Sequence, residues 1–234
     1  MSGPTGTVTP LVTECIRVGV APRMVVVMLH GYAMRAADLS PFAHSLGVPA
    51  VFYVPEAPLP AVLSGRAWWP MDLVGRRRAL AVGPRDLAQE QPSGAPAARA
   101  QLRELVWRVR VDHPGLPVAV IGFSQGGMLA CDAVLHDDIR ADCLALLSSS
   151  RIDIANWAQR AERLKGMPVL VSHGEADDDV AFTAGEALRD FCAGAGAEVT
   201  WIAFPEGHAI PLVVWRGIRR FLTELGSRAP AGEA

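Results

Sequence analysis

Short runs of β-branched residues alternate along this chain with longer stretches in which apolar residues recur at helical spacing. The apolar runs predict strands over residues 14–20, 24–29, 51–54, 118–121, 143–147, 169–172 and 199–204. The helical spacing predicts helices over residues 36–46, 97–111, 125–136, 182–193 and 213–225, with a shorter one over 154–164. Such alternation is typical of a mostly parallel α/β sheet. The last four strands read as near-continuous apolar runs, which predicts helices over both of their faces.

One long segment, residues 55–96, breaks this alternation. It is rich in Pro, Gly and Arg and contains Trp68 and Trp69. Irregular stretches of this length in a compact domain are usually functional or disordered. We therefore expect its first part to cover a site and residues 83–96 to form a mobile surface loop. A chain of 234 residues can form one α/β domain with a sizeable core, so a single domain is expected over residues 1–234, with flexible termini at 1–10 and 226–234.

The composition narrows the range of partners. A net charge of −2 gives no reason to expect nucleic acid or an anionic membrane as a partner. The four cysteines are scattered without metal-ligand spacing, so buried free thiols and no metal site are expected. The first ten residues lack the pattern of a signal peptide, and the apolar run at residues 24–29 is too short to span a bilayer. We expect a cytoplasmic protein without stable membrane insertion.

The most informative stretch is Gly122-Phe123-Ser124-Gln125-Gly126. A predicted strand runs into this Gly-x-Ser-x-Gly pattern and a predicted helix follows at once, which is the context of a nucleophile elbow. The two glycines remove the Cβ atoms that would clash in so tight a turn. This context predicts Ser124 as a nucleophile raised above the end of the sheet.

A serine hydroxyl needs a base and usually a carboxylate behind it. In folds with this elbow the chain order is serine, acid, histidine. Of the six histidines, only His208 lies in a loop after the last predicted strand, whereas the other five lie in turns at strand ends or on and beside helices. The acid should follow the strand at 169–172, where four carboxylates occur within five positions: Glu175, Asp177, Asp178 and Asp179. Spacing leaves the choice among them open, since some can be solvated or can cap the helix that begins near Phe182.

An acyl-transfer site also needs two N–H donors for the developing negative charge. One predicted donor is the amide of Gln125, directly after the nucleophile. The other should come from the loop after an early strand, where Leu29-His30-Gly31-Tyr32 occurs. Because Gly31 allows a close turn, the amide of Tyr32 is the predicted second donor.

Taken together, these motifs resemble the phospholipase/carboxylesterase family of α/β-hydrolases, which includes acyl-protein thioesterases and small bacterial carboxylesterases. The matching pieces are residues 29–31, 122–127, 173–177 and 207–208, with a weaker match at 66–70. The resemblance implies an α/β-hydrolase fold, with a mostly parallel central sheet flanked by helices, and it puts the acid at Asp177 of a His-Gly-x-x-Asp pattern. Where the family commonly continues to Val-Pro, this chain has Asp178-Asp179-Val180-Ala181, which leaves Asp179 open as a substitute acid.

The sequence therefore predicts a serine carboxylesterase with Ser124, Asp177 and His208 as its triad, no cofactor and a small-molecule ester as substrate. The span between the strands at 143–147 and 169–172 is too short for a large cap domain. We therefore expect Trp68, Trp69 and Met34 to line an open apolar groove that takes short- to medium-chain acyl groups. An acyl thioesterase or lysophospholipase would use the same triad. A non-catalytic binding protein is the alternative of another class, and a homodimer is left open.

Overall fold

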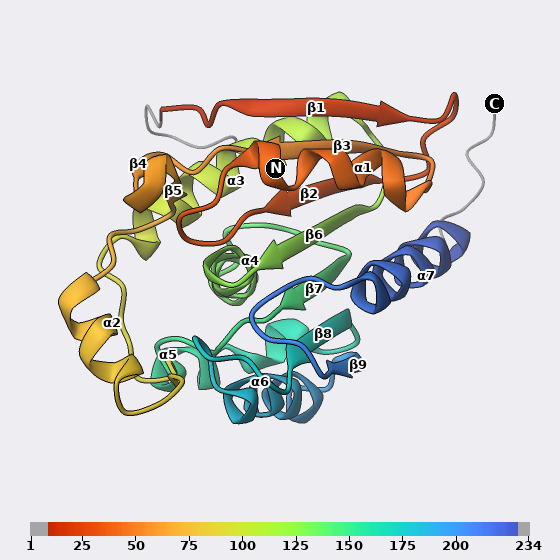
Figure 1. The fold of residues 1–234 in the computed structure, drawn as a ribbon. Helices are drawn as coiled ribbons and strands as arrows, with labels where there is room; N and C mark the ends of the chain where they lie inside the picture. Colours follow the sequence, from red (N-terminus) through yellow and green to blue (C-terminus); the bar gives the residue numbers. More distant parts are fainter. Residues whose placement is uncertain (1–8, 229–234) are drawn as a thin grey trace.

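The computed structural model describes residues 9–228 (Figure 1). Among these residues, seven strands form one sheet in the order β1-β3-β2-β6-β7-β8-β9. Their bounds are β1 Thr13–Val18, β2 Val25–Leu29, β3 Ala50–Pro55, β6 Val118–Phe123, β7 Cys143–Leu147, β8 Pro168–Gly174 and β9 Glu198–Phe204. Only β1 is antiparallel to its neighbour. The carboxyl ends of the other six strands therefore meet at one edge of the sheet, as the sequence predicts.

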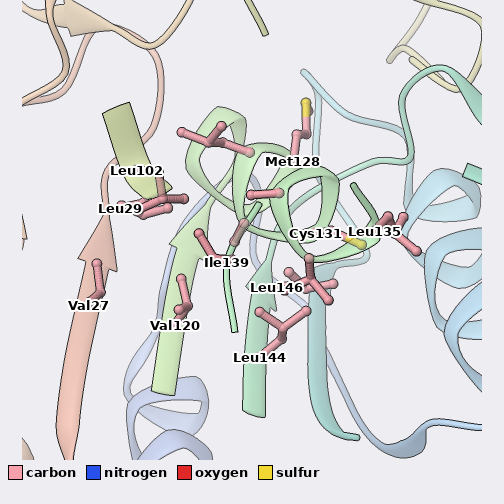
Figure 2. Close-up of a cluster of buried hydrophobic side chains, with 14 of the residues drawn as sticks. Val27, Leu29, Leu102, Val120, Met128, Cys131, Leu135, Ile139, Leu144 and Leu146 are labelled. Atoms are coloured by element: carbon pink, nitrogen blue, oxygen red, sulfur yellow. The ribbon is translucent and has the colours of Figure 1, made fainter. Parts of the chain in front are cut away.

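Helices cover both faces of this sheet (Figure 1). The bounds of the longer ones are α1 Ser40–Leu46, α3 Ala95–Asp112, α4 Gln125–Leu135, α6 Phe182–Gly194 and α7 Leu212–Arg228. Side chains of α3, α4 and α6 form one apolar core with the first face, and those of α1 and α7 form a second core with the other. Figure 2 shows part of the first core, where Leu102 of α3 lies beside Leu29 of β2, and Leu135 of α4 belongs to the same cluster as Val120 and Leu144. Complete burial of one such side chain stabilises the fold by about 1.5–3 kcal/mol.

Strand β9 departs from the predicted pattern of burial. All residues of β6 and β7 are buried, as expected of strands covered on both faces. In β9, in contrast, Glu198, Thr200 and Ala203 are exposed and only Phe204 is fully buried. Because β9 is the edge strand, it has a neighbour on one side only. Val199 and Trp201 still pack against the first core and Ile202 against the second, so both faces are covered in part, but the prediction of complete burial is wrong for this strand.

The irregular segment at residues 55–96 is more ordered than the sequence predicts. It contains β4 (Leu59–Pro60) paired with β5 (Arg66–Ala67), followed by the exposed helix α2 (Leu73–Leu80). Its last part is not a free surface loop, since Leu87 and Ala88 are buried in the body of the protein. Arg85 also pairs through its backbone with residues 179 and 181, at distances of 2.9 Å. The prediction of a mobile surface loop over residues 83–96 is therefore wrong, because burial and hydrogen bonds hold this segment to the rest of the protein.

The C-terminal helix extends further than predicted. Helix α7 continues to Arg228, and Gly226 is buried at a point where a Cβ would contact the side chain of Met24. The expected flexible tail therefore does not begin at residue 226. The rest of the predicted flexible termini, residues 1–8 and 229–234, lies outside the described residues.

Candidate active site

Ser124 lies between the end of β6 and the first residue of α4. Its backbone angles, φ 51° and ψ −117°, are outside the regions that a non-glycine residue ordinarily occupies. A Cβ on Gly122 would collide with the backbone of Gly126, and one on Gly126 would collide with the carbonyl of Leu29. The turn is this tight because both positions lack a side chain. The backbone thus has the strand–turn–helix geometry that the motif predicts.

Neighbouring strand ends hold this strained serine in place. The amide of Ser124 donates to the carbonyl of Leu147 at 2.8 Å, and the buried hydroxyl of Ser149 donates to the carbonyl of Ser124, also at 2.8 Å. A Cβ on Gly127 would overlap that hydroxyl. Sequence analysis missed Ser149. The signal available was the run Ser148-Ser149-Ser150 directly after a buried strand.

The structure brings His208 and Asp177 together. Asp177 follows β8 and His208 follows β9, so both lie at the carboxyl edge of the sheet. The Nδ1 atom of His208 is 2.7 Å from Oδ2 of Asp177, which leaves Nε2 as the nitrogen that can accept a proton. The other oxygen of Asp177, Oδ1, accepts the amides of Asp179 and Val180 at 2.9 Å each. These bonds orient the carboxylate toward the imidazole.

A second histidine supports the same carboxylate. His173 is fully buried, and its Nε2 is 3.0 Å from the carbonyl of Val180 and 3.3 Å from Oδ2 of Asp177. Since a carbonyl can only accept, the proton of this ring is assigned to Nε2. Burial by itself would raise the pKa of Asp177, but hydrogen bonds from His173, His208 and the backbone hold it well below its usual range. Asp177 is therefore ionised wherever the imidazole of His208 can act as a base. Sequence analysis placed His173 only in a turn.

The remaining acids of this loop have other surroundings. Asp178 is exposed. Asp179 lies between two guanidinium groups, at 2.9 Å from Arg76 and 2.6 Å from Arg85. It caps no helix, because the residue before α6 is Ala181. The prediction that one of these acids caps the helix near Phe182 is wrong, and of the four acids in this loop only Asp177 contacts His208.

The two predicted oxyanion donors come from neighbouring strands. The amide of Gln125 belongs to the first turn of α4, where N–H groups lack an intrahelical acceptor. Tyr32 follows β2, which pairs directly with β6. The ring of His30 holds this loop, since Nδ1 donates to the carbonyl of Gly31 at 2.8 Å and Nε2 accepts the amide of Ala57 at 3.1 Å. Desolvation lowers the pKa of His30, so a neutral imidazole acts here as a structural link.

The side chain of Gln125 fixes the tryptophan segment. Its Oε1 accepts the amide of Trp68 at 2.9 Å, and its Nε2 donates to the carbonyl of Trp69 at 3.1 Å. The indole N–H of Trp68 donates to the carbonyl of His30 at 2.8 Å. Trp68 is 1% exposed, belongs to the apolar core and does not line the cavity. The expectation that Trp68 binds substrate is therefore corrected: this side chain supports the loop that carries the predicted donor Tyr32.

A cavity of about 940 Å³ opens over these groups. Its wall includes Ser124, Gln125, His208 and Tyr32, together with the predicted substrate-binding residues Met34 and Trp69. The predicted nucleophile, the predicted base and the residues of both predicted donors therefore line one cavity.

Within residues 9–228, no group of three or more His, Cys, Asp or Glu side chains is arranged to hold a metal ion, and no helix is long and apolar enough to cross a membrane. All four cysteines are free. Cys131, Cys143 and Cys192 are buried, but Cys15 is exposed on β1, which corrects the expectation that every thiol is buried.

Taken together, a mostly parallel sheet, a serine elbow after β6, an acid after β8 and a histidine after β9 define an α/β-hydrolase fold. The chain belongs to the phospholipase/carboxylesterase family, whose model matches residues 79–225. Family membership classes it with ester hydrolases. Acyl-protein thioesterase 1 of Neurospora crassa is 28% identical over 142 residues, which cover 58% of this chain and 57% of that protein. The chain thus matches just over half the length of this relative.

Solved structures show the same fold. Esterase PE8 has a TM-score of 0.76 at 23% identity, covering 92% of this chain and 99% of that one. A carboxylesterase from Mesorhizobium loti has a TM-score of 0.70 at 20% identity, with 92% and 98% covered. Acyl-protein thioesterase 2 of Zea mays has a TM-score of 0.70 at 21% identity, again with 92% and 98% covered. At these identities the likeness concerns the fold.

Proposed function

We propose that this protein is a serine carboxylesterase that hydrolyses short- to medium-chain carboxylic esters through an acyl-enzyme intermediate. The observation that carries the proposal is the 2.7 Å contact of His208 Nδ1 with Asp177 Oδ2, next to a cavity that also exposes Ser124. Membership of the phospholipase/carboxylesterase family supports it. The reaction needs no cofactor.

In this mechanism Ser124 Oγ attacks the carbonyl carbon of the ester while Nε2 of His208 accepts the hydroxyl proton. Asp177 holds the tautomer of His208 that has Nε2 free, and it stabilises the imidazolium that forms. The amides of Tyr32 and Gln125 donate to the carbonyl oxygen as it becomes negative, and one such donor typically contributes about 10²–10³ in rate. His208 then returns the proton to the alcohol oxygen as the ester bond breaks. Water attacks the acyl-enzyme by the same steps and releases the acid and free Ser124.

The predicted acyl preference comes from the shape of the site. The span between β7 and β8 covers residues 148–167, which leaves no room for a large cap domain, and apolar side chains such as Met34 and Trp69 line the open cavity. We expect the best kcat/KM on p-nitrophenyl esters of short to medium acyl length. Strong interfacial activation on emulsified long-chain triglycerides would contradict this preference.

An acyl thioesterase or a lysophospholipase is the second candidate, since either would use the same triad. The similarity to acyl-protein thioesterase 1 of Neurospora crassa favours it. Comparison of oxygen esters, thioesters and lysophospholipids of matched acyl length separates these activities. A cytoplasmic location and a homodimer remain predictions.

A non-catalytic binding protein is the candidate of another class. Labelling with a fluorophosphonate probe and a burst of p-nitrophenol would exclude it. Ser124→Ala should remove both while the melting temperature stays close to that of the wild type, because the hydroxyl makes no hydrogen bond with the described residues. Loss of a triad member typically costs on the order of 10⁴–10⁶ in rate. Labelling that persists in Ser124→Ala would show that another residue is the nucleophile.

A further inference from the structure

Two arginines and one carboxylate form a charged cluster on the wall of the cavity. Asp179 accepts from Nη2 of Arg76 at 2.9 Å and from Nη2 of Arg85 at 2.6 Å. Arg85 is largely buried, with 9% of its side chain exposed, and all three residues line the same cavity as Ser124. Burial alone would raise the pKa of Asp179, but the two guanidiniums lower it. The cluster therefore holds two positive charges and one negative charge.

This cluster has more donors than acceptors. Each guanidinium carries five N–H groups, whereas one carboxylate offers about four acceptor positions. The Nε atoms of Arg76 and Arg85 are buried and have no hydrogen-bond partner among residues 9–228. A ligand with further acceptor oxygens would match such a cluster.

Other carboxylates on the cavity wall do not supply those acceptors. Asp72 accepts the amides of Val74 and Gly75 at the start of α2. Asp38 accepts the amide of Arg35, and Glu90 is exposed to solvent. Within the described part of the chain, none of these carboxylates forms an ion pair or hydrogen bond with the guanidinium of either arginine. The surplus positive charge is therefore local to the cluster.

The cluster lies beside the catalytic groups, and helix α2, which carries Arg76, lies apart from helices α1 and α7 (Figure 1). The amide of Asp179 donates to the triad acid Asp177 at 2.9 Å. Apolar lining residues such as Phe42 and Trp215 belong instead to the core formed by α1 and α7. An ester has its acyl chain and its alcohol on opposite sides of the reacting bond. An apolar acyl chain in the apolar part directs the alcohol toward the arginines.

We propose that Arg76 and Arg85 form a subsite for an anionic group, a carboxylate or a phosphate, on the alcohol half of the substrate. This inference rests on the proposed esterase function, because it assigns the two halves of an ester to the two parts of its cavity.

The test uses butyrate esters of ω-hydroxycarboxylic acids of increasing length, whose alcohol half ends in a carboxylate. Each is compared with the neutral ester in which a primary amide replaces that carboxylate. In a parallel series a phosphate stands in place of the carboxylate. We expect kcat/KM of the best anionic ester to exceed that of its neutral counterpart about tenfold at low salt, as one charged hydrogen bond allows. The preference should fall as salt rises. If kcat/KM of the anionic ester is no higher than that of the neutral ester at every length in both series, the subsite is overturned. A failure to hydrolyse any ester would instead refute the proposed function, and calorimetric binding of the free hydroxycarboxylate would then still decide the subsite.

Substitutions of single charged residues test whether the preference for anionic esters arises at this cluster. Arg76→Gln should bring the anionic-to-neutral ratio close to one. Arg77→Gln should keep the wild-type ratio, because it removes the same charge from an exposed position on α2 that does not line the cavity. Asp179→Asn should raise the ratio, since it leaves both arginines without a negative partner. If Arg76→Gln and Arg77→Gln lower the anionic-to-neutral ratio of kcat/KM equally, the preference arises from the overall positive charge of α2, and the subsite is overturned. A larger preference for an acyl-side anion, as in p-nitrophenyl hemisuccinate, would overturn its assignment to the alcohol half. Melting temperatures of all variants check that each is folded.

Discussion

Replacement of Asp177 by Asn tests the geometry of the candidate triad most directly. In the wild type, Oδ1 accepts two backbone amides at 2.9 Å and Oδ2 accepts Nδ1–H of His208 at 2.7 Å. An asparagine can keep the two amide bonds only with its oxygen at the first position, which turns its NH₂ group toward His208. The opposite orientation would lose both amide bonds, at about 1–3 kcal/mol for each buried group left unpaired. We therefore expect the NH₂ group to face the imidazole.

That orientation forces the wrong tautomer of His208. With an NH₂ group at hydrogen-bond distance, Nδ1 must accept, so the proton moves to Nε2 and the ring can no longer take the proton of Ser124. The expected loss in kcat is about 10⁴, which corresponds to about 5.5 kcal/mol in the barrier. Steady-state hydrolysis of p-nitrophenyl butyrate measures it, with thermal unfolding as the check on folding.

Two neighbouring acids serve as matched controls for this substitution. Asp178→Asn changes an exposed carboxylate, and Asp179→Asn changes one that contacts Arg76 and Arg85. Each should keep kcat on the neutral ester within about tenfold, or about 1.4 kcal/mol. A severe Asp179→Asn variant combined with a mild Asp177→Asn variant would refute the reasoning and move the acid by two residues.

The remaining predictions concern the tryptophan segment and pH. Trp68→Phe should lower the free energy of unfolding by about 1–3 kcal/mol in denaturant titrations, because the buried carbonyl of His30 loses its donor. It should leave the acyl-length profile unchanged, whereas Trp69→Ala should shift that profile, since Trp69 lines the cavity. Burial raises the pKa of Asp177, but its hydrogen bonds lower the pKa overall. The ionised carboxylate should therefore contribute fully to the free energy of unfolding above about pH 4, and this contribution should be lost as the pH falls further. The acid limb of kcat/KM above about pH 4 should accordingly follow one ionisation, and a second-order decline there would contradict an ionised Asp177.

Most helices, strands and the elbow were predictable because their causes are local. Apolar spacing decides whether a segment can bury one face as a helix or both faces as a strand, and β6 and α3 follow that spacing closely. Gly122 and Gly126 flank Ser124 in the sequence, so the absence of side chains at the tight turn is visible without a structure. The order of serine, acid and histidine also pointed to His208.

Contacts between distant segments were not predictable in this way. Asp179 and Arg85 lie 94 positions apart, and Trp68 and Gln125 lie 57 apart. The sequence shows an acid in a crowded loop and a tryptophan in an irregular segment. It does not show that the guanidinium of Arg85 pairs with Asp179, or that the side-chain amide of Gln125 holds Trp68.

For this protein, the sequence by itself determined the alternation of strands and helices and the tight serine turn, and it indicated Ser124 and His208 as candidate nucleophile and base, since these depend on neighbouring residues and on chain order. Spacing left four carboxylates open and only the family resemblance favoured Asp177. The tertiary structure brings Asp177 to His208, because two backbone amides and the ring of His173 orient its carboxylate. It also decided that Trp68 is buried while Trp69 lines the cavity. The physical reason is that burial and hydrogen-bond partners come from segments that only the folded sheet brings together.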